Sequence, residues 1–284
     1  MHPANDTISA AHLGAVEETL LIPLRGRALE HRQRRPLLRD PEAARMVAAI
    51  DYDFEKFDGP SVRGSVWRAR IYDAMVRRWM AAHPGGTVVE VGCGLNTRFE
   101  RLDDGRVRWR DLDVPDVIAL WRRFLTETDR RRAIASSAFE TAWMDALMDE
   151  VDAPVLFVSE ASTLYFSADD NRQFYAELAL RFPGAEVIFD TANAAFIAGQ
   201  DKQDALRHCA ARMTWAVEDP AELEAWGLTM LARFSYFRPP RARRRGAPLR
   251  YRLKLWLASA LHPPLRTIYQ INQARLPGAT PASG

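Results

Sequence analysis

The 284-residue chain has few cysteines, no long hydrophobic run and almost no net charge. Its two cysteines, Cys93 and Cys209, exclude a disulfide framework and a four-cysteine zinc site, and they fit a reducing compartment. No apolar run approaches the roughly 18 residues that a membrane-spanning helix needs, so we expect no membrane span. A formal net charge of +2 excludes a disordered tail protein of one charge sign.

The N-terminus and the histidines lead to two further expectations. The first fourteen residues have no basic start followed by an apolar run, which predicts that there is no signal peptide and that the protein is cytoplasmic. None of the six histidines falls in an HxH or HxxxH pattern, so we predict no metal site. What is present, with 48% hydrophobic residues, is the composition of a globular protein with one large core or two small ones.

Hydrophobic periodicity divides the chain into three parts. Residues 1–83 are predicted to form an N-terminal helical cap, with one helix over 17–29 broken at Pro23 and another over 64–82. Residues 84–240 are predicted to form the core, in which short apolar runs alternate with helical patterns. This alternation predicts an α/β fold with a doubly wound, mainly parallel sheet. The predicted strands of this core cover residues 87–91, 107–112, 134–137, 155–158, 186–190 and 234–237.

Two segments do not follow the alternation of strands and helices. Residues 191–230 are mixed in pattern and would suit a helical lid over the sheet. Residues 241–284 are predicted to be a basic C-terminal segment, since residues 238–254 contain eight Arg and Lys residues and no acid. Such a stretch can bind nucleic acid or an anionic membrane, but a solvated basic loop is more common, and we expect no nucleic-acid partner.

The residues that indicate chemistry follow the first predicted strand. This strand leads into Gly92-Cys93-Gly94, and Asp113 follows 21 residues after Gly92. In a doubly wound sheet, ligands bind at the carboxyl ends of the strands. Glycines there let the backbone approach a ligand, and an acid after the second strand can accept both hydroxyls of a ribose. The spacing therefore predicts an adenosine-containing ligand, with a purely structural turn as the alternative.

Two neighbouring residues favour one adenosine ligand over another. A dinucleotide fingerprint requires a third glycine where this chain has Thr97. Glu90, just before the glycines, is also unlike the apolar strand end preferred beside a pyrophosphate. Both departures favour S-adenosylmethionine, which has no phosphate, over the NAD of an oxidoreductase.

The runs Glu90–Arg98 and Val107–Ile118 resemble the leucine carboxyl methyltransferase family. The resemblance is closer to its bacterial branch of polyketide O-methyltransferases. It extends over about residues 15–240, through 18–24, 50–53, 135–137, 155–165 and 181–186. It implies a class I, Rossmann-like methyltransferase that uses S-adenosylmethionine.

The resemblance also implies roles for individual residues. Arg70 would pair with the carboxylate of the cofactor, Asp113 would bind its ribose, and Glu160 would lie beside it. Ser137 and Ala138 would contact the adenine, and Gly92 would lie under the cofactor. Glu90 and Gly94 complete the expected cofactor-binding residues. The chain departs from the family in having Glu140 instead of an aspartate, so no role is assigned to Glu140. It also has Ala161-Ser-Thr163 instead of a more hydrophobic stretch, which points to a different substrate pocket.

The expected chemistry is an in-line methyl transfer, which mainly requires alignment of the two reactants and exclusion of water. A carboxylate, with a pKa of about 4, needs no general base, whereas a phenol with a pKa of about 10 would benefit from one. We therefore predict a small natural-product carboxylic acid as substrate and a methyl ester as product. A phenol and a peptide or protein C-terminus are the alternatives. No catalytic residue is assigned, but His208 is the candidate base for a phenol, and Tyr165 is either a core or a substrate-binding residue.

Overall fold

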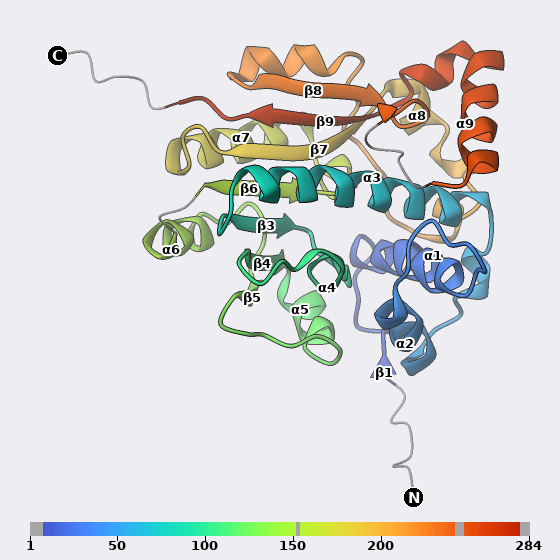
Figure 1. Ribbon diagram of the computed structural model, residues 1–284, viewed down its shortest axis with the longest axis horizontal. Coiled ribbons are helices and arrows are strands. Elements are labelled where there is room, and N and C mark those ends of the chain that lie inside the picture. Colours follow the sequence, from blue (N-terminus) through green and yellow to red (C-terminus); the bar gives the residue numbers. More distant parts are fainter. Residues whose placement is uncertain (1–7, 152–153, 242–246, 279–284) are drawn as a thin grey trace, which may run out of the picture.

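A seven-stranded sheet forms the centre of the protein in a computed structural model that describes residues 8–151, 154–241 and 247–278 (Figure 1). The strand order is β5-β4-β3-β6-β7-β9-β8. The first five of these strands are parallel, and β9 is antiparallel to both of its neighbours. The predicted α/β class with a mainly parallel sheet is therefore confirmed. The strands are β3 (Thr87–Val91), β4 (Arg108–Asp113), β5 (Arg131–Ala135), β6 (Val155–Ser159), β7 (Glu186–Ala192), β8 (Thr229–Ser235) and β9 (Tyr269–Arg275).

Helices cover both faces of the sheet because successive strand residues point to opposite sides. Val88 packs in a cluster with Trp67 and Trp79 of α3, while its neighbour Val89 belongs to the cluster on the other face. A small separate sheet pairs β1 (Ile8–Ser9) with β2 (Ile50–Asp51). The helices are α1 (Leu21–His31), α2 (Pro41–Ala49), α3 (Pro60–Ala82), α4 (Arg98–Leu102), α5 (Pro115–Trp121), α6 (Ala142–Glu150), α7 (Ala168–Arg181), α8 (Ala194–Ala198) and α9 (Leu249–Leu261).

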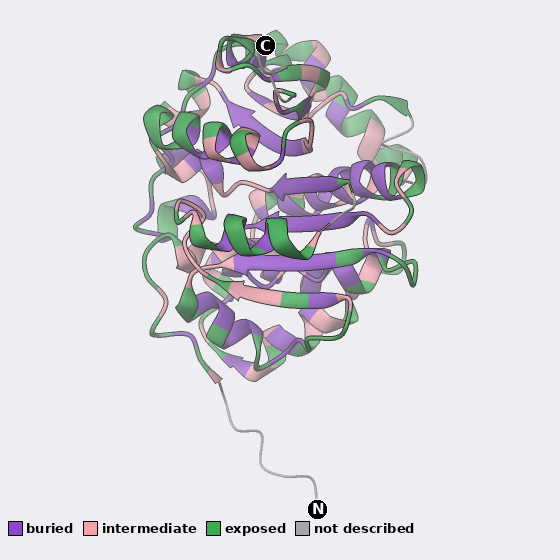
Figure 2. Ribbon diagram, turned by 90° about the vertical axis from the view of Figure 1, so that its left-hand side faces the viewer, coloured by how far each residue is buried: buried purple, intermediate pink, exposed green. Residues whose placement is uncertain are grey.

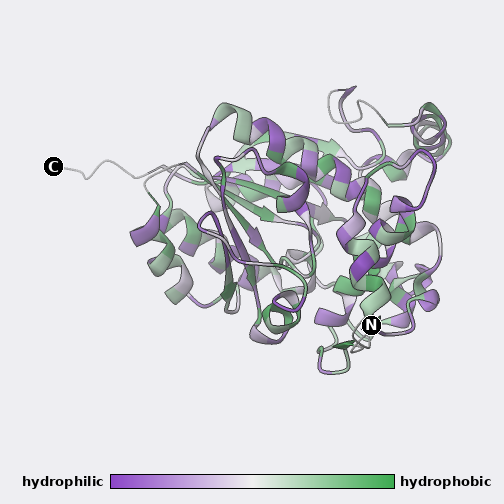
Figure 3. Cartoon of the chain, turned by 60° about the horizontal axis from the view of Figure 1, so that its bottom comes forward, coloured by the Kyte–Doolittle hydropathy of each residue, from purple (hydrophilic) through white to green (hydrophobic). Residues whose placement is uncertain are grey.

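Burial of the strands follows their place in the sheet. The central strands β3 and β6 are buried at every residue, as expected for parallel strands covered on both faces, whereas the edge strand β5 is partly exposed (Figure 2). In Figure 3, which colours the chain by hydropathy, the strands are mainly hydrophobic, whereas the helices carry both hydrophobic and hydrophilic residues. Among the described residues, no helix combines the length and the hydropathy needed to cross a membrane.

The structure corrects several sequence predictions. Pro23 does not break a helix, because α1 starts at Leu21 and the missing N–H of Pro23 falls in the first turn. Strand β5 starts and ends earlier than the predicted 134–137, and β8 ends at Ser235 instead of Phe237. Strand β9 lies in the segment 241–284 that was expected to be only a basic tail, and it pairs with β7 and β8. The core sheet therefore extends past residue 240 to Arg275.

Candidate functional site

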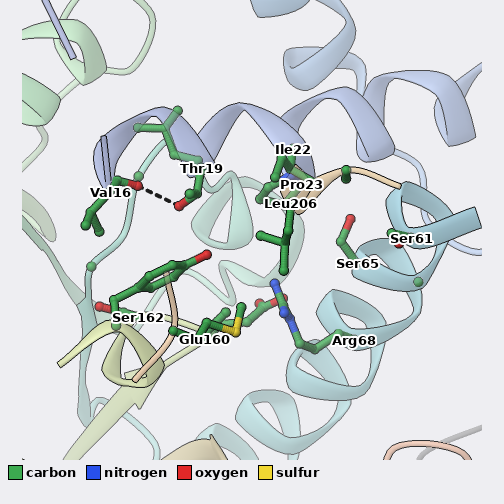
Figure 4. Close-up of a pocket in the computed structure, with 18 of the residues that line it drawn as sticks. Val16, Thr19, Ile22, Pro23, Ser61, Ser65, Arg68, Glu160, Ser162 and Leu206 are labelled. Atoms are coloured by element: carbon green, nitrogen blue, oxygen red, sulfur yellow. Dashed lines mark hydrogen bonds and ion pairs between the residues drawn. The ribbon is translucent and has the colours of Figure 1, made fainter. Parts of the chain in front are cut away.

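A cavity of about 540 Å³ lies at the carboxyl ends of strands β3, β4 and β6. Its wall combines the loop after β3, the end of β4 and the loop after β6 with residues of α1 and α3 (Figure 4). Segments after β7 and at the ends of β8 and β9 close it further. The cavity thus lies where a doubly wound sheet is expected to bind its ligand.

The glycine turn after β3 approaches this cavity with its backbone. Gly92 and Gly94 have φ angles of +68° and +52°, in the left-handed region that favours glycine. The N–H of Gly92 donates to the carbonyl of Leu112 at 2.9 Å, which ties the turn to β4. A Cβ atom on Gly92 would lie 2.2 Å from Oγ of Ser162, so the turn is packed against the loop after β6.

Asp113 ends strand β4 beside the same turn. Its Oδ2 accepts a hydrogen bond from the N–H of Gly94 at 2.7 Å, and its Oδ1 accepts one from the N–H of Val114 at 2.8 Å. Burial raises the pKa of Asp113 to about 6, and the nearby charge of Glu17 adds to this increase, against the lowering effect of the two N–H groups. Each carboxylate oxygen keeps acceptor capacity for a ligand hydroxyl.

Glu160, which follows β6, lies between two arginines. Nε of Arg68 donates to its Oε1 at 2.8 Å, and Nη2 of Arg98 donates to its Oε2. Figure 4 shows Arg68 and Glu160 extending toward one another across the cavity floor. Burial would raise the pKa of Glu160, but the attraction of Arg68 and Arg98 outweighs it and lowers the pKa below its usual value. Glu160 is therefore a fixed negative charge in the site.

Arg98 also organises the acids behind the glycine turn. It is fully buried, its Nε donates to Asp73 at 2.9 Å, and its Nη1 donates to Oε1 of Glu90. Oε2 of Glu90 is buried and has no partner among the described residues, although Glu90 lines the cavity. A buried acceptor without a partner is costly, so this oxygen is suited to accept a hydrogen bond from a ligand.

Strand β9 reaches the site through Tyr269. Nη1 of Arg68 donates to the hydroxyl of Tyr269 at 3.1 Å, and this hydroxyl donates to Oδ2 of the fully buried Asp190 at 2.5 Å. The N–H of Ala161 donates to Oδ1 of Asp190 at 2.9 Å. Ala161 has a φ angle of +63°, a strained value for a residue with a side chain, and its contact with Asp190 helps to hold it there.

Many of the residues that line the cavity are apolar. Residues 191–230, the predicted lid, contribute Phe196, Leu206 and Met213 to it. Phe196 packs against the ring of Tyr269 with 5.1 Å between centroids, so the lid segment contacts strand β9. Other large apolar residues of the cavity wall include Leu20, Ile22, Pro23, Phe166, Phe237, Leu265 and Ile268.

Most of the predicted site residues lie together in this cavity. They are Glu90, Gly92, Gly94, Asp113, Glu160 and Tyr165. Arg70 does not line it: its Nη1 donates to the carbonyl of Leu37, outside the cavity, and the arginine at the cavity is Arg68. Arg70 therefore lies outside the cavity in which it was expected, and Arg68 lies in the cavity wall.

Three other predicted residues also lie away from the cavity wall. The carbonyl of Ala138 accepts from the indole N–H of Trp143 at 3.4 Å, and Oγ of Ser137 accepts from the N–H of Phe139 at 3.3 Å. Both lie beyond the end of β5. His208 is exposed and is not among the residues that line the cavity, and Nε of Arg207 donates to its Nε2 at 3.1 Å.

The sequence analysis missed Arg68 and Tyr269. Arg68 lies on the same predicted helix as Arg70, and the periodicity of that helix did not separate the two. Tyr269 belongs to an unpredicted strand, in which Gln270, Asn272 and Gln273 obscure the apolar pattern. The run Glu90–Arg98 did contain Arg98, but its ion pairs with Asp73 of α3 and Glu160 after β6 join residues that are distant in sequence.

The thiols and acids of the described residues give no sign of metal or thiol chemistry. Cys93 and Cys209 are both buried and unpaired, and burial raises the pKa of Cys93 well above its usual value, so this thiol is a poor nucleophile. Within residues 8–151, 154–241 and 247–278, no three His, Cys, Asp or Glu side chains are grouped as a metal site would need.

The sheet order, the glycine turn and the acid ending β4 are those of a Rossmann-like fold with a site for an adenosine-containing ligand. The proteins of similar sequence define the class as S-adenosylmethionine-dependent methyltransferases. A solved protein described as a DUF574 family protein, from Streptomyces avermitilis, has the same fold with a TM-score of 0.50 at 15% identity. The match covers 89% of this chain and 97% of that one.

The sequence comparisons then define the family. The family described as "Leucine carboxyl methyltransferase" matches residues 21–179. The tetracenomycin polyketide synthesis O-methyltransferase TcmP of Streptomyces glaucescens is 34% identical over 216 residues, which cover 75% of this chain and 79% of TcmP. The S-adenosyl-L-methionine-dependent methyltransferase dpfgK of Gibberella zeae is 28% identical over 235 residues, with 75% and 78% covered. This chain belongs to the leucine carboxyl methyltransferase family.

Proposed function

We propose that this methyltransferase converts the carboxylate of a small, largely apolar natural product into its methyl ester. The observation that carries the proposal is the lining of the cavity, in which charged side chains such as Asp113, Glu160 and Arg68 occur together with many large apolar ones. Among the described residues that line it there is no histidine. A substrate that is already ionised needs no general base, which favours a carboxylate.

The charged residues that line the cavity have the chemistry that the cofactor requires. Asp113 would accept the ribose hydroxyls, and Val114 and Val117 offer apolar surface for the adenine. Oε2 of Glu90 lacks a partner and would accept a hydrogen bond from the amino group of the methionine moiety. Arg68, held by Glu160, would pair with its carboxylate. When bound, S-adenosylmethionine supplies an electrophilic methyl group on sulfur.

The protein itself contributes alignment and exclusion of water. The glycine turn and the loop carrying Ala161 would hold the cofactor, and the lid residues Phe196, Leu206 and Met213 would cover the acceptor. Holding two reactants in line contributes about 7–11 kcal/mol toward lowering a barrier, without any proton transfer. The relative named for tetracenomycin polyketide synthesis supports a polyketide-like acceptor.

A phenolic acceptor is the second candidate, and one observation favours it. The cations that line the cavity, Arg27 and Arg68, are each already paired with an acid, Asp40 and Glu160. A neutral phenol would need no cationic partner. A peptide or protein C-terminus, the other carboxylate expected from the sequence, would have to place its last residues in the same cavity.

A matched pair of acceptors tests the proposal. The purified protein is incubated with S-adenosylmethionine and either an aromatic carboxylic acid or the phenol with the same ring system. Products are identified by mass spectrometry before and after mild alkali, which releases methanol from a methyl ester but not from an aryl ether. An alkali-labile product from the acid supports the proposal. An alkali-stable product from the phenol alone would overturn it in favour of the second candidate.

A further inference from the structure

Helix α9 exposes a continuous apolar stripe, which we call the α9 stripe: Leu249, Leu253, Trp256, Leu257 and Leu261. The exposed fractions of these side chains run from 43% for Leu257 to 73% for Leu249 and Leu261. Their spacing places them on one side of a helix with 3.6 residues per turn. Only four other large hydrophobic side chains are exposed in the described parts of the chain, and they are scattered.

The opposite side of α9 holds the helix on the protein. Leu255 and Ser259 are buried, and Oγ of Ser259 accepts a hydrogen bond from Nε of Arg238 at 2.7 Å. The ring of Tyr251 packs on Trp67 of α3 with 5.3 Å between centroids. Figure 1 places α9 at the edge of the molecule, beside the ends of α3 and β8. The α9 stripe is therefore not needed to attach the helix to the protein. Its exposed apolar side chains are suited to contact the surface of a partner.

The charge around the stripe indicates what that surface is. Arg250 and Lys254 are exposed and follow directly on Leu249 and Leu253. The guanidinium of Arg238 lies 6.0 Å from the centroid of the Trp256 ring. After Glu224 the sequence contains eleven Arg and Lys residues and no Asp or Glu. The partner surface must therefore be apolar with an anionic border.

A second copy of this chain does not satisfy that requirement. A two-fold interface brings the same patch of both subunits together. The basic residues beside the α9 stripe of one subunit would then face the same basic residues of the other subunit. No acid on α9 or its described flanks could offset this repulsion.

We propose that the α9 stripe docks on an anionic lipid bilayer, with α9 lying in the interface. Helices with Trp and Leu on one face and Arg and Lys beside them bind membranes in this way, without spanning them. The turn Pro263–Arg266 follows α9 closely. Leu265 in this turn and Ile268 just after it both line the cavity. Docking would place this wall of the cavity at the lipid surface, where an apolar acceptor accumulates. The inference does not depend on whether the acceptor is a carboxylate or a phenol.

The experiment is co-sedimentation of the full-length protein with vesicles of phosphatidylcholine alone or mixed with phosphatidylglycerol, at low and high salt. We expect binding to the mixed vesicles that weakens as salt rises. The charge variant Arg250→Gln/Lys254→Gln should bind about 30-fold more weakly, since each basic residue near an anionic surface contributes about fivefold. The stripe variant Leu253→Ser/Leu257→Ser should lose binding at every salt concentration.

Matched controls use exposed residues elsewhere on the surface. Leu180→Ser changes a leucine of α7 that is 75% exposed, and Arg172→Gln removes a charge from the same helix, so both should bind like the wild type. Absence of binding by the folded wild type, or equal loss in the control variants, would overturn the proposal. So would a dimer in solution that the stripe variant converts to a monomer, because the stripe would then be a subunit interface. Salt-sensitive capture of an acidic protein, with no vesicle binding, would likewise overturn it.

Discussion

Arg68 and Arg70 differ by two positions on one helix, but only Arg68 reaches the cavity, so they form a matched pair for testing the site. We predict that Arg68→Met weakens binding of S-adenosylhomocysteine about 10- to 150-fold. This factor corresponds to the loss of charge-assisted hydrogen bonds contributing about 1.5–3 kcal/mol. Arg70→Met removes a donor to the carbonyl of Leu37, outside the cavity, and should leave the affinity within about twofold of wild type.

The structure also sets the expected cost in stability. Removing one partner of a buried ion pair costs about 3–5 kcal/mol, but Glu160 keeps its contact with Arg98 when Arg68 is lost. The loss should therefore lie near the lower end, and the variant should remain folded. Arg68→Lys keeps the charge but not the fork that reaches Glu160 and Tyr269 together, and it should have an intermediate affinity.

Isothermal titration calorimetry with S-adenosylhomocysteine measures these affinities, and thermal unfolding of the same samples measures stability. Unchanged affinity in folded Arg68→Met would refute the assignment of Arg68 to the cofactor. So would an equal loss in Arg70→Met, because it would show that any disturbance of α3 weakens binding.

Three further predictions concern neighbouring features. Asp113 is protonated below its raised pKa of about 6 and ionised above it, so cofactor affinity should fall as pH drops through 6, and Asp113→Asn should flatten this dependence in a calorimetric pH series. Gly92→Ala should abolish cofactor binding, because its Cβ would meet Oγ of Ser162. The control Gly105→Ala, at a similar φ but in open space, should lower the free energy of unfolding by only about 1 kcal/mol in a denaturant titration. His208→Ala should leave kcat unchanged with either acceptor, since His208 is exposed outside the cavity; a large loss with the phenol alone would restore it as a base.

Local patterns predicted the parallel half of the sheet well. The run 87–91 is apolar and β-branched around a single acid, and the position of Asp113 after Gly92 depends on the short connection between β3 and β4. These features are encoded within about thirty residues of one another, so the cofactor end of the site could be predicted from them.

The features that the sequence did not reveal depend on long-range contacts. Strand β9 contains the buried polar residue Asn272, whose Nδ2 donates to Oγ1 of Thr191 on β7 at 3.1 Å. A pattern of hydrophobicity cannot identify such a residue as buried until its partner is known. The choice between Arg68 and Arg70 likewise depends on Glu160 and Tyr269, which are 92 and 201 positions away from Arg68.

The position of β9 between β7 and β8 also constrains how the molecule can be made. Among the described strands β8 pairs only with β9, which follows it in the sequence, so β8 cannot join the sheet before β9 lies between it and β7. Tyr269, the first residue of that strand, brings the hydroxyl that joins Arg68 to Asp190. A chain without the segment that begins at Tyr269 would have neither a docked β8 nor a complete site. Completion of the sheet and completion of the site thus depend on the same strand.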